Sequence, residues 1–416
     1  MTLPISDNII RRKKLFILVL GSVLYFLTCM AKLLVPAIIY DDLLKSGLDS
    51  RMIAGTGAAF MYSYAVSQLL VGVFSNRYGG VRILLIGGSL FAAGTLAFPW
   101  LNSYPLMIVC RIAAGLGAGT VFLGVVKLLG DLFSKKFALA LGFVMLCSYF
   151  GPVCGTTPMV LLVKAAGWQM AMTLPGALAL AVSFCIILLM RGTLKAVTRG
   201  ETFSSLIKML KNRQMWLLDI SVPILFGAYY IIVSQIGQKS ITDHCAMSPE
   251  FASGVILLLT IIVAVNNIGI NGILKLFGNR HKPVSMLAYL ITFSGAITGC
   301  IAFSLDNSIV LITTAFILIA IPAGFFPLFC AVSREINPPE ETGLAVALLN
   351  FWCFVFIAVF QNISGKILQH FAIEGQTEYP SEAYRWILGF IALAVLAGAI
   401  ITMFIRKTGG HTAKKQ

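Results

Sequence analysis

The sequence predicts an all-α membrane protein in which twelve transmembrane helices form two pseudo-symmetric six-helix bundles. Hydrophobic residues make up 58% of the 416 residues and charged residues only 11%, whereas a soluble globular protein carries about 25% charged residues. The apolar residues gather in runs that are long enough to cross a bilayer as a helix, which takes about 20 residues. This composition excludes an ordinary soluble enzyme, and the 29 Phe residues exclude a disordered chain.

Twelve segments reach spanning length, and most are apolar all round, as expected of helices that face lipid or pack inside a bundle. The first segment follows a basic cluster at 11–14, which also resembles the start of a signal peptide. We expect this segment to be retained, because its apolar run is long and lacks a convincing cleavage site. The predicted spans are 15–39, 52–71, 83–100, 105–129, 137–163, 169–190, 215–237, 251–274, 284–304, 308–332, 342–369 and 385–405.

Basic residues indicate the orientation, because cytoplasmic loops of membrane proteins are enriched in Lys and Arg. Of the 31 Lys and Arg residues, 22 lie in segments on the side of the two termini and five lie in the opposite loops, Lys239 among them. The sequence therefore predicts that both termini are cytoplasmic. We expect a multi-pass protein of a bacterial cytoplasmic (inner) membrane.

The longest polar gap on the predicted inner side divides the chain into two halves. We expect an N-terminal six-helix bundle at 1–190, a basic cytoplasmic linker at 191–214, a C-terminal six-helix bundle at 215–405 and a cytoplasmic tail at 406–416. Two halves of six helices are typical of transporters that are built from repeats. We expect the protein to be a monomer.

Charge and cysteine patterns narrow the range of partners. The net charge of +15 is compatible with nucleic-acid binding, but the basic residues lie in short gaps between apolar runs, so we expect no nucleic-acid partner. The nine Cys residues contain no CxxC pair and no zinc-like Cys/His spacing. We expect no metal ion and no cofactor, and the expected partners are the lipid bilayer and a small-molecule substrate.

The most informative stretch joins the second and third predicted spans and reads Gly72-Val-Phe-Ser-Asn-Arg-Tyr-Gly-Gly-Val-Arg82. Gly72 and Gly79 permit close helix approach and a tight turn, and Arg77 and Arg82 can bond carbonyls or acids at neighbouring helix ends. The stretch resembles the signature of the major facilitator superfamily, which falls in the same loop. This resemblance implies the major facilitator fold and a role for the turn in conformational change.

Other positions extend or modify the resemblance. Asn76 stands where the superfamily usually has Asp, and Asp131, at the inner end of the fourth span, is a substitute partner for Arg77. Arg111-Ile-Ala-Ala-Gly-Leu-Gly is similar to the fourth-span motif of the superfamily. Gly151-Pro152-Val-Cys-Gly is similar to a fifth-span element that is common in exchangers, although such kinks also occur wherever membrane helices pack closely.

Within the superfamily, Tyr25-Phe26, the Tyr62–Gln68 stretch and Lys127…Phe133 resemble the bacterial sugar-phosphate and organic-anion permeases. Those permeases often have an Arg three residues after the Tyr. Thr28 occupies that place here, and the nearest cation is Lys32. The resemblance implies a small organic anion as the substrate class and leaves the individual substrate open.

Cations inside the predicted spans are the main functional candidates, since an ionisable residue near the bilayer centre costs about 2.5–3.5 kcal/mol on insertion scales. Lys32 shares a helix face with Tyr25 and Thr28, a polar stripe that is suited to line a cavity. Arg111 either contacts a ligand or bonds helix-end carbonyls below the surface. Lys366 is expected to extend its charge to the membrane surface.

Acidic residues and His are absent from the middle of the predicted spans, and Asp219 lies only about four residues into the seventh. Proton-coupled transporters commonly place a carboxylate or a His in the cavity. A cavity with cations and no carboxylate favours an anion, with Lys32 as its counter-charge. The four His residues, which fall in predicted loops or tails, are expected to be solvated.

Neutral polar residues recur at helical spacing and could hydrogen-bond the uncharged part of a substrate. Each is also explained by hydrogen bonding between helices, and both interpretations stay open. These candidate substrate contacts are Tyr64 and Gln68 in the second span, Tyr230 and Ser234 in the seventh, Asn267 in the eighth, and Asn350, Trp352 and Gln361 in the eleventh.

The sequence therefore predicts a secondary transporter that moves a small organic anion or zwitterion by alternating access between two bundles. The alternatives are a non-transporting receptor of the same fold and an exporter or siderophore permease. We do not expect an enzyme, because no His cluster or paired carboxylates fall at membrane depth. Direct use of ATP is not expected either, since the sequence has no phosphate-binding Gly-rich loop.

Overall fold

The computed structural model describes residues 7–33, 35, 38–78, 80–132, 137–190, 209–245, 247–305, 308–337, 342–373 and 377–406. The helices of the N-terminal half are α1 (Asp7–Leu33), α2 (Tyr40–Lys45), α3 (Ser50–Tyr78), α4 (Gly80–Ala97), α5 (Tyr104–Leu132), α6 (Phe137–Cys154), α7 (Thr157–Ala166) and α8 (Trp168–Met190). Those of the C-terminal half are α10 (Arg213–Ile231), α11 (Gly237–Cys245), α12 (Pro249–Leu276), α13 (His281–Ala302), α14 (Ile309–Ala323), α15 (Phe326–Glu335), α16 (Thr342–His370) and α17 (Ser381–Met403).

In the described residues these helices make twelve passes, because α6 continues into α7, α10 into α11 through a π-helical segment at Ile232–Ile236, and α14 into α15. Ten of the passes are long and apolar enough to cross a membrane, and Phe150–Ala166 in the α6–α7 pass is a shorter apolar helix. The predicted all-α membrane fold is therefore confirmed.

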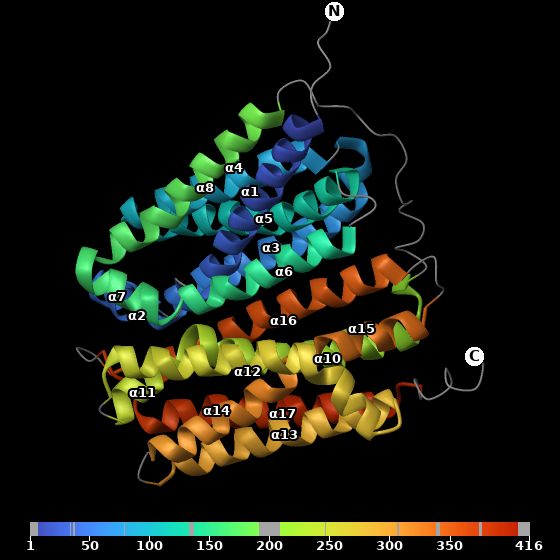
Figure 1. Cartoon of the computed structure of the whole chain (residues 1–416). Helices are drawn as coiled ribbons and strands as arrows, with labels where there is room; N and C mark the ends of the chain where they lie inside the picture. The colour runs from blue at the N-terminus through green and yellow to red at the C-terminus, as the bar shows by residue number, and fades with distance from the viewer. Residues whose placement is uncertain are drawn as a thin grey trace, which may run out of the picture.

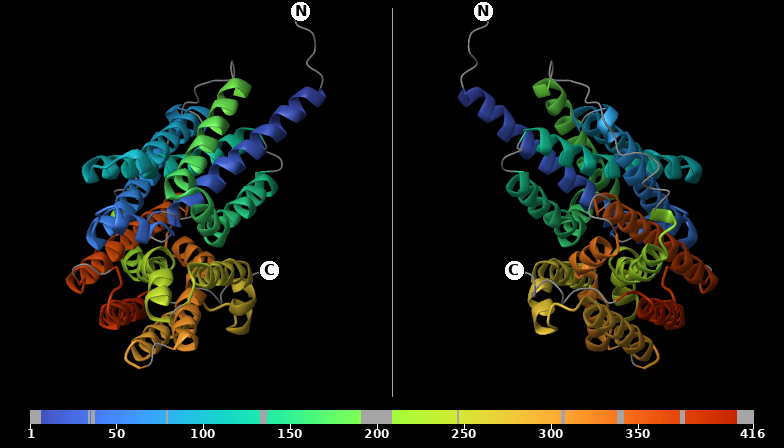
Figure 2. Two further views of the ribbon diagram at one scale, coloured as in Figure 1. Left: turned by 90° about the vertical axis from the view of Figure 1, so that its left-hand side faces the viewer. Right: turned by 90° about the vertical axis from the view of Figure 1, so that its right-hand side faces the viewer.

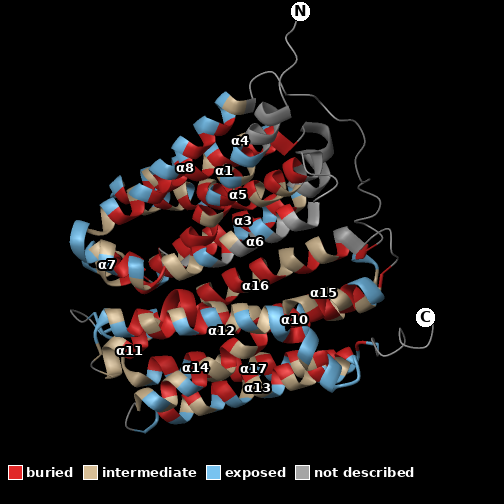
Figure 3. Cartoon of the chain, viewed as in Figure 1, coloured by how far each residue is buried: buried red, intermediate tan, exposed pale blue. Residues whose placement is uncertain are grey.

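Two groups of helices, α1–α8 and α10–α17, lie one above the other in Figure 1, and the end-on views of Figure 2 show the same division. They meet where α3 packs along α16 and where α12 packs against α6 and α7. Figure 3 shows buried residues on the faces between helices and exposed ones on the outer surface. Exposed side chains such as Ile268, Leu393 and Val310 are large and apolar, as expected of a surface that faces lipid.

The helices run between two opposite ends of the molecule (Figure 1). The α2/α7 end carries α2, α7 and α11, and the opposite end is where α1 begins and α17 ends (Figure 1). Asn212 helps to start α10 at the opposite end, because its side-chain oxygen accepts a hydrogen bond from the backbone N–H of Gln214 (3.0 Å). Ser248 caps α12 at the α2/α7 end in the same way, accepting from Phe251 N–H (3.3 Å).

The connection between the second and third spans is shorter than the sequence suggests. Helix α3 extends to Tyr78 and α4 begins at Gly80, so most of the 72–82 motif is helical. Arg82 is exposed on the first turn of α4. Other predicted conformational residues, namely Gly72, Asn76, Arg77, Gly79 and Asp131, lie outside the part whose side-chain environment is described, so their roles stay predictions. Most of the predicted linker, 191–208, also lies outside the described residues.

Two sequence expectations about polar residues are wrong. The predicted loop after the seventh span is helix α11, and Lys239 within it is buried rather than solvated. His281 is buried as well, and its Nδ1 lies 3.6 Å from a carboxylate oxygen of Glu335. Both errors arise because hydropathy detects polar residues but does not show whether tertiary contacts cover them.

Candidate functional site

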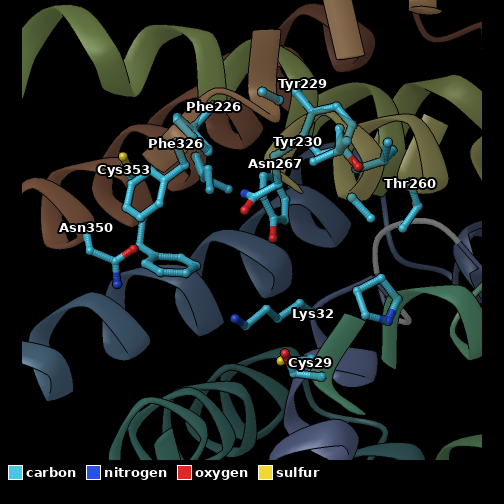
Figure 4. Close-up of a pocket in the computed structure, with 18 of the residues that line it drawn as sticks. Cys29, Lys32, Phe226, Tyr229, Tyr230, Thr260, Asn267, Phe326, Asn350 and Cys353 are labelled. Atoms are coloured by element: carbon cyan, nitrogen blue, oxygen red, sulfur yellow. The ribbon is translucent and has the colours of Figure 1, made fainter. Parts of the chain in front are cut away.

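A cavity of about 260 Å³ lies between the two halves. Its walls come from α1 and α6 on one side and from α10, α12, α15 and α16 on the other, together with Val233 and Ala323. Figure 4 shows Lys32 and Cys29 on the side opposite Tyr229, Tyr230 and Asn267. A central cavity with walls from both halves is the geometry in which a relative movement of the halves changes access to a bound molecule.

Among the described residues that line this cavity, Lys32 is the only charged one. Its side chain is buried, and its Nζ lies 4.2 Å from the ring centroid of Tyr64 and 4.9 Å from that of Phe354. Aromatic faces attract a cation through their quadrupole, which explains how the ammonium group is tolerated there. No ion pair found among the described residues includes Lys32, so its charge has no carboxylate partner of its own.

The remaining wall combines aromatic surface with a few polar groups. Phe226 packs edge-on against Phe326 (centroids 5.3 Å apart), and Tyr229 packs edge-on against Tyr230 (5.6 Å). Polar atoms come from Ser148, Thr260, Asn267 and Asn350, and thiols from Cys29 and Cys353. An apolar wall with few polar groups is typical of small-molecule sites.

The structure brings some of the predicted contact residues to this cavity and places others elsewhere. Tyr25, Lys32, Tyr230, Asn267, Asn350 and the kink residue Pro152 line the cavity. Tyr64 lies immediately behind the Lys32 ammonium group. Those that do not line it are Thr28, Gln68, Arg111, Ser234, Trp352 and Gln361.

Four of the residues outside the lining, Thr28, Gln68, Ser234 and Gln361, form hydrogen bonds away from the cavity. Thr28 is buried and donates to the backbone carbonyl of Tyr25 (2.7 Å). Gln68 donates to the Gly119 carbonyl (3.4 Å), and Gln361 donates to the Ser234 hydroxyl (3.0 Å). These are contacts within one helix or between neighbouring helices, as the alternative interpretation of the polar residues anticipated.

Trp352 packs against Trp216, with ring centroids 5.3 Å apart. Asp219, which the sequence places close to the inner surface, is 1% exposed in α10. Its Oδ1 has no hydrogen-bond partner in the part of the chain that the structure describes. Neither residue lines the cavity.

Arg111 is buried inside the N-terminal half, with 1% of its surface exposed. Its guanidinium lies 4.5 Å from the ring centroid of Phe60, and its Nε donates to the backbone carbonyl of Thr56 (3.2 Å). Thr56 lies in the second turn of α3 rather than at a helix end, so the contact is with a helix carbonyl inside the bundle. Among the described residues, Nη2 of Arg111 has no hydrogen-bond partner.

Close packing explains Gly151, the other residue of the predicted fifth-span element. A side chain at this position would place its Cβ 2.7 Å from the carbonyl oxygen of Phe26 and 2.9 Å from Cys29 Cβ. The glycine therefore lets α6 approach α1 beside the cavity. Its neighbour Pro152 lies inside α6, where it interrupts the backbone hydrogen bonding of the helix.

Several lining residues were not predicted from the sequence. Phe354 and Cys353 lie in α16, Phe226 and Tyr229 in α10, and Phe326 in α15. A signal existed for Phe354, because it lies four residues after Asn350 on the same helix face. Aromatic residues are so frequent in these spans that hydropathy alone does not separate cavity walls from lipid-facing surface.

At the α2/α7 end an ion-pair cluster joins the two halves. Lys239 in α11 lies 2.9 Å from Asp41 Oδ1 in α2 and 2.7 Å from Asp243 Oδ1 one turn along its own helix. Asp243 also accepts hydrogen bonds from Tyr384 OH (2.9 Å) and Tyr379 N–H (3.2 Å). The contact from Asp41 to Lys239 is the part of this cluster that crosses between the halves.

Further contacts between the halves lie at the same end. The hydroxyl groups of Tyr40 and Tyr379 are 3.1 Å apart, and Lys164 in α7 forms an ion pair with Glu250 in α12. A side chain at Gly365 of α16 would meet Ala54 Cβ of α3 at 2.3 Å, which shows how closely these helices approach. The α2/α7 end is thus held together by polar contacts and tight packing.

A sequence model described as Major Facilitator Superfamily matches residues 18–298. The chain belongs to the Major Facilitator Superfamily. The crystal structure of a D-xylose–proton symporter has the same fold, with a TM-score of 0.72 at 15% identity over 96% of this chain and 99% of that one. The resemblance found in the 72–82 motif is thus confirmed, and the fold is that of a family of membrane transporters.

Curated relatives of this superfamily member are transporters of differing substrates. The choline/ethanolamine transporter flvcr2a of Danio rerio is 26% identical over 204 residues, which cover 49% of this chain and 40% of the relative. Monocarboxylate transporter 14 of Mus musculus is 34% identical over 116 residues, or 28% of this chain and 23% of the relative. The matched part of the chain therefore spans two fifths or less of the length of these relatives.

Proposed function

We propose that this superfamily member is a secondary transporter that moves a small organic anion or zwitterion through the central cavity by alternating access. The observation that carries the proposal is the Lys32 ammonium group, which is held in the cavity wall and forms no ion pair with a carboxylate in the described part of the chain. A buried charge without a partner is costly. An anionic group on the substrate offsets that cost, and the aromatic walls are suited to its apolar part.

Two relatives bear names that point to opposite charges, a choline/ethanolamine transporter and a monocarboxylate transporter. Choline carries a fixed positive charge, and the lining residues of this chain offer Lys32 and no carboxylate to such a ligand. We therefore propose a carboxylate, a phosphorylated metabolite or a zwitterion whose acidic group lies at Lys32. In a zwitterion, the aromatic wall opposite Lys32 would face the cationic part.

We further propose that the α2/α7 end faces away from the cytoplasm, that both termini are cytoplasmic, and that the protein works as a monomer in a bacterial inner membrane. The charge bias of the loops supports this orientation. In the described conformation the contacts at the α2/α7 end join the halves. Substrate release at that end then requires these contacts to break.

Ligand binding and counterflow test the proposal. The purified protein is screened by thermal shift against organic anions, phosphorylated metabolites, amino acids, choline and neutral sugars, and labelled hits are assayed for counterflow in proteoliposomes. Lys32→Gln is expected to weaken binding about 10- to 150-fold, because a hydrogen bond to a charged group contributes about 1.5–3 kcal/mol. Lys32→Arg keeps the charge, and Lys275→Gln at an exposed site is the matched control.

Three results would contradict the proposal. Stabilisation by choline or by a neutral sugar alone would reject the anionic substrate. Unchanged binding by Lys32→Gln would reject the counter-charge role. Binding without counterflow of the labelled ligand would favour a receptor of the same fold over a transporter.

A further inference from the structure

A second hollow, of about 480 Å³, opens on the outer surface between α3, α5 and α16, away from the central cavity. Its polar lining residues are Arg51 and Tyr62 of α3, Tyr104 of α5, and Asn362 and Lys366 of α16. We call this hollow the lateral groove. Because it lies on the outside of a membrane-embedded fold, its natural surroundings are lipids.

The described residues that line the lateral groove include two cations, Arg51 and Lys366, and no carboxylate. The carboxylate of Asp49 lies near enough to the groove residue Tyr104 to interact with it electrostatically. Arg51 lies in the first turn of α3, Lys366 lies one turn before the end of α16, and both side chains are exposed. Neither takes part in an ion pair found among the described residues. The acid nearest in sequence, Asp49, accepts a hydrogen bond from the backbone N–H of Met52 (2.7 Å) at the start of α3.

A third cation, Arg111, contacts the backbone of α3 next to a groove residue. Its Nε donates to the carbonyl of Thr56, the residue that follows Gly55. The guanidinium is buried, and its Nη2 has no hydrogen-bond partner among the described residues. In a low-dielectric interior a charge acts over a longer distance than it would in water.

An apolar stripe continues the lateral groove along α3. Val66 and Leu70 follow Tyr62 at intervals of four residues and are 45% and 47% exposed. At about 1.5 Å per residue, Leu70 lies roughly 28 Å along the helix from Arg51. The stripe itself, from Tyr62 to Leu70, is about 12 Å long at the same rise, and one leaflet of the hydrocarbon core is about 15 Å thick, so the stripe can contact most of the length of an acyl chain.

We infer that the lateral groove binds an anionic phospholipid. The phosphate lies between Arg51 and Lys366, and the hydroxyl groups of Tyr62 and Tyr104 and the amide of Asn362 are available for the rest of the headgroup. The acyl chain follows the apolar stripe. Positive charge at one end and an apolar path from it match an amphiphile, whereas a soluble phosphate would leave the apolar stripe unused.

This binding mode has a conformational consequence, because the walls of the lateral groove come from both halves. Asn362 of α16 lies within 3.5 Å of the Tyr62 hydroxyl of α3, to which its amide donates. A phosphate that contacts Arg51 and Lys366 together requires α3 and α16 to stay packed at this end. The lipid therefore favours the conformation in which the α2/α7 end is closed.

Lipid binding to the purified full-length protein in an uncharged detergent tests this inference. Native mass spectrometry and thermal shift compare dioleoyl-phosphatidylglycerol, dioleoyl-phosphatidylcholine and free glycerol phosphate. Wild-type protein is expected to bind phosphatidylglycerol at least tenfold more tightly than phosphatidylcholine. The double variant Arg51→Gln/Lys366→Gln is expected to lose about 10- to 30-fold in phosphatidylglycerol affinity, since each basic side chain near an anionic lipid contributes to binding. Lys45→Gln, an exposed cation of α2 at the same end, is the control and keeps wild-type binding.

Three outcomes would overturn the inference. They are equal affinity for the two lipids, unchanged phosphatidylglycerol binding by the double variant, and binding of glycerol phosphate as tight as that of the lipid. If the double variant does not fold, as judged by its lipid-free melting temperature, the single variants decide. Lys366→Gln is then expected to weaken binding and Lys366→Arg to restore it, and equal binding by these two variants would reject the role of the charge.

Discussion

Replacing Asp41 by Asn tests the contribution of the ion pair that joins α2 to the C-terminal half. Asp41 lies 2.9 Å from Lys239, and the two residues belong to different halves of the molecule. Lys239 keeps its second partner, Asp243, at 2.7 Å in the same helix. The substitution therefore removes one contact between the halves without leaving a buried lysine unpaired.

The expected loss follows from the exposure of the two side chains. Asp41 is 48% exposed and Lys239 only 5%, and the two charged atoms are 2.9 Å apart. Exposed ion pairs contribute about 0.2–1 kcal/mol, and removing one partner of a fully buried pair costs about 3–5 kcal/mol. We expect a value between these limits, about 1–2 kcal/mol, which shifts the equilibrium away from the closed α2/α7 end about 5- to 30-fold.

Distance distributions between spin labels measure this shift. The labels are attached at Lys45 and Thr377, which are exposed at the α2/α7 end and belong to different halves. They report the distance between the two halves at this end, in a protein whose nine native Cys residues have been replaced. Asp41→Asn is expected to raise the population at the longer distance. Asp42→Asn is the control, because it removes the neighbouring charge in the same helix. Asp42 forms no ion pair among the described residues, so this substitution is expected to leave the distance distribution unchanged.

Two outcomes would refute this reasoning. Identical distributions for the wild type and Asp41→Asn would show that the ion pair contributes nothing to closure. An equal shift for Asp42→Asn would show that the net charge of α2, rather than the contact with Lys239, controls the equilibrium.

Three further predictions concern packing and the cavity. Gly151→Ala is expected to lower stability by about 1–3 kcal/mol, because its Cβ would overlap α1. The matched control is Gly389→Ala, which has open space around it and should be neutral or stabilising. A similar melting temperature for both variants would contradict the packing argument. Tyr64→Leu removes the ring beside the Lys32 ammonium group and is expected to weaken ligand binding about 2- to 30-fold. Tyr64→Phe keeps the ring, and its ligand affinity is expected to stay within about threefold of the wild type. Equal effects of the two variants in a binding titration would exclude the cation–π contact. Gln361→Leu removes the hydrogen-bond donor to Ser234. It is expected to lower the free energy of unfolding by about 1–3 kcal/mol and to leave ligand affinity unchanged. A loss of affinity without a loss of stability would instead place Gln361 in the binding site.

The spans and a part of the cavity wall could be predicted from the sequence because both depend on local information. Hydropathy over a window of residues reports the cost of placing a segment in lipid, and this signal survives without knowledge of the neighbours. Helical spacing correctly put Tyr25 and Lys32 on one face, and both line the cavity. The same spacing included Thr28, whose hydroxyl bonds its own helix, because periodicity gives the face of a residue and not its hydrogen-bond partner.

Polar residues near the ends of the spans were predicted less well. Lys239 was expected in a solvated loop, and it is buried between Asp41 and Asp243. Arg51 and Lys366 are separated by more than 300 positions in the chain, and they line one groove only because α3 packs along α16. No local sequence pattern predicts the contact of Lys239 with Asp41 or the proximity of Arg51 to Lys366.

The sequence by itself determined the membrane class, the family motif and the presence of a cation at cavity depth, since each is a property of one helix or one turn. Only the tertiary structure decided which polar groups meet across the two halves, how the α2/α7 end is held closed and where a lateral groove opens. The physical reason is that burial and charge pairing depend on the distance between helices. That distance is set by side-chain packing over the whole bundle.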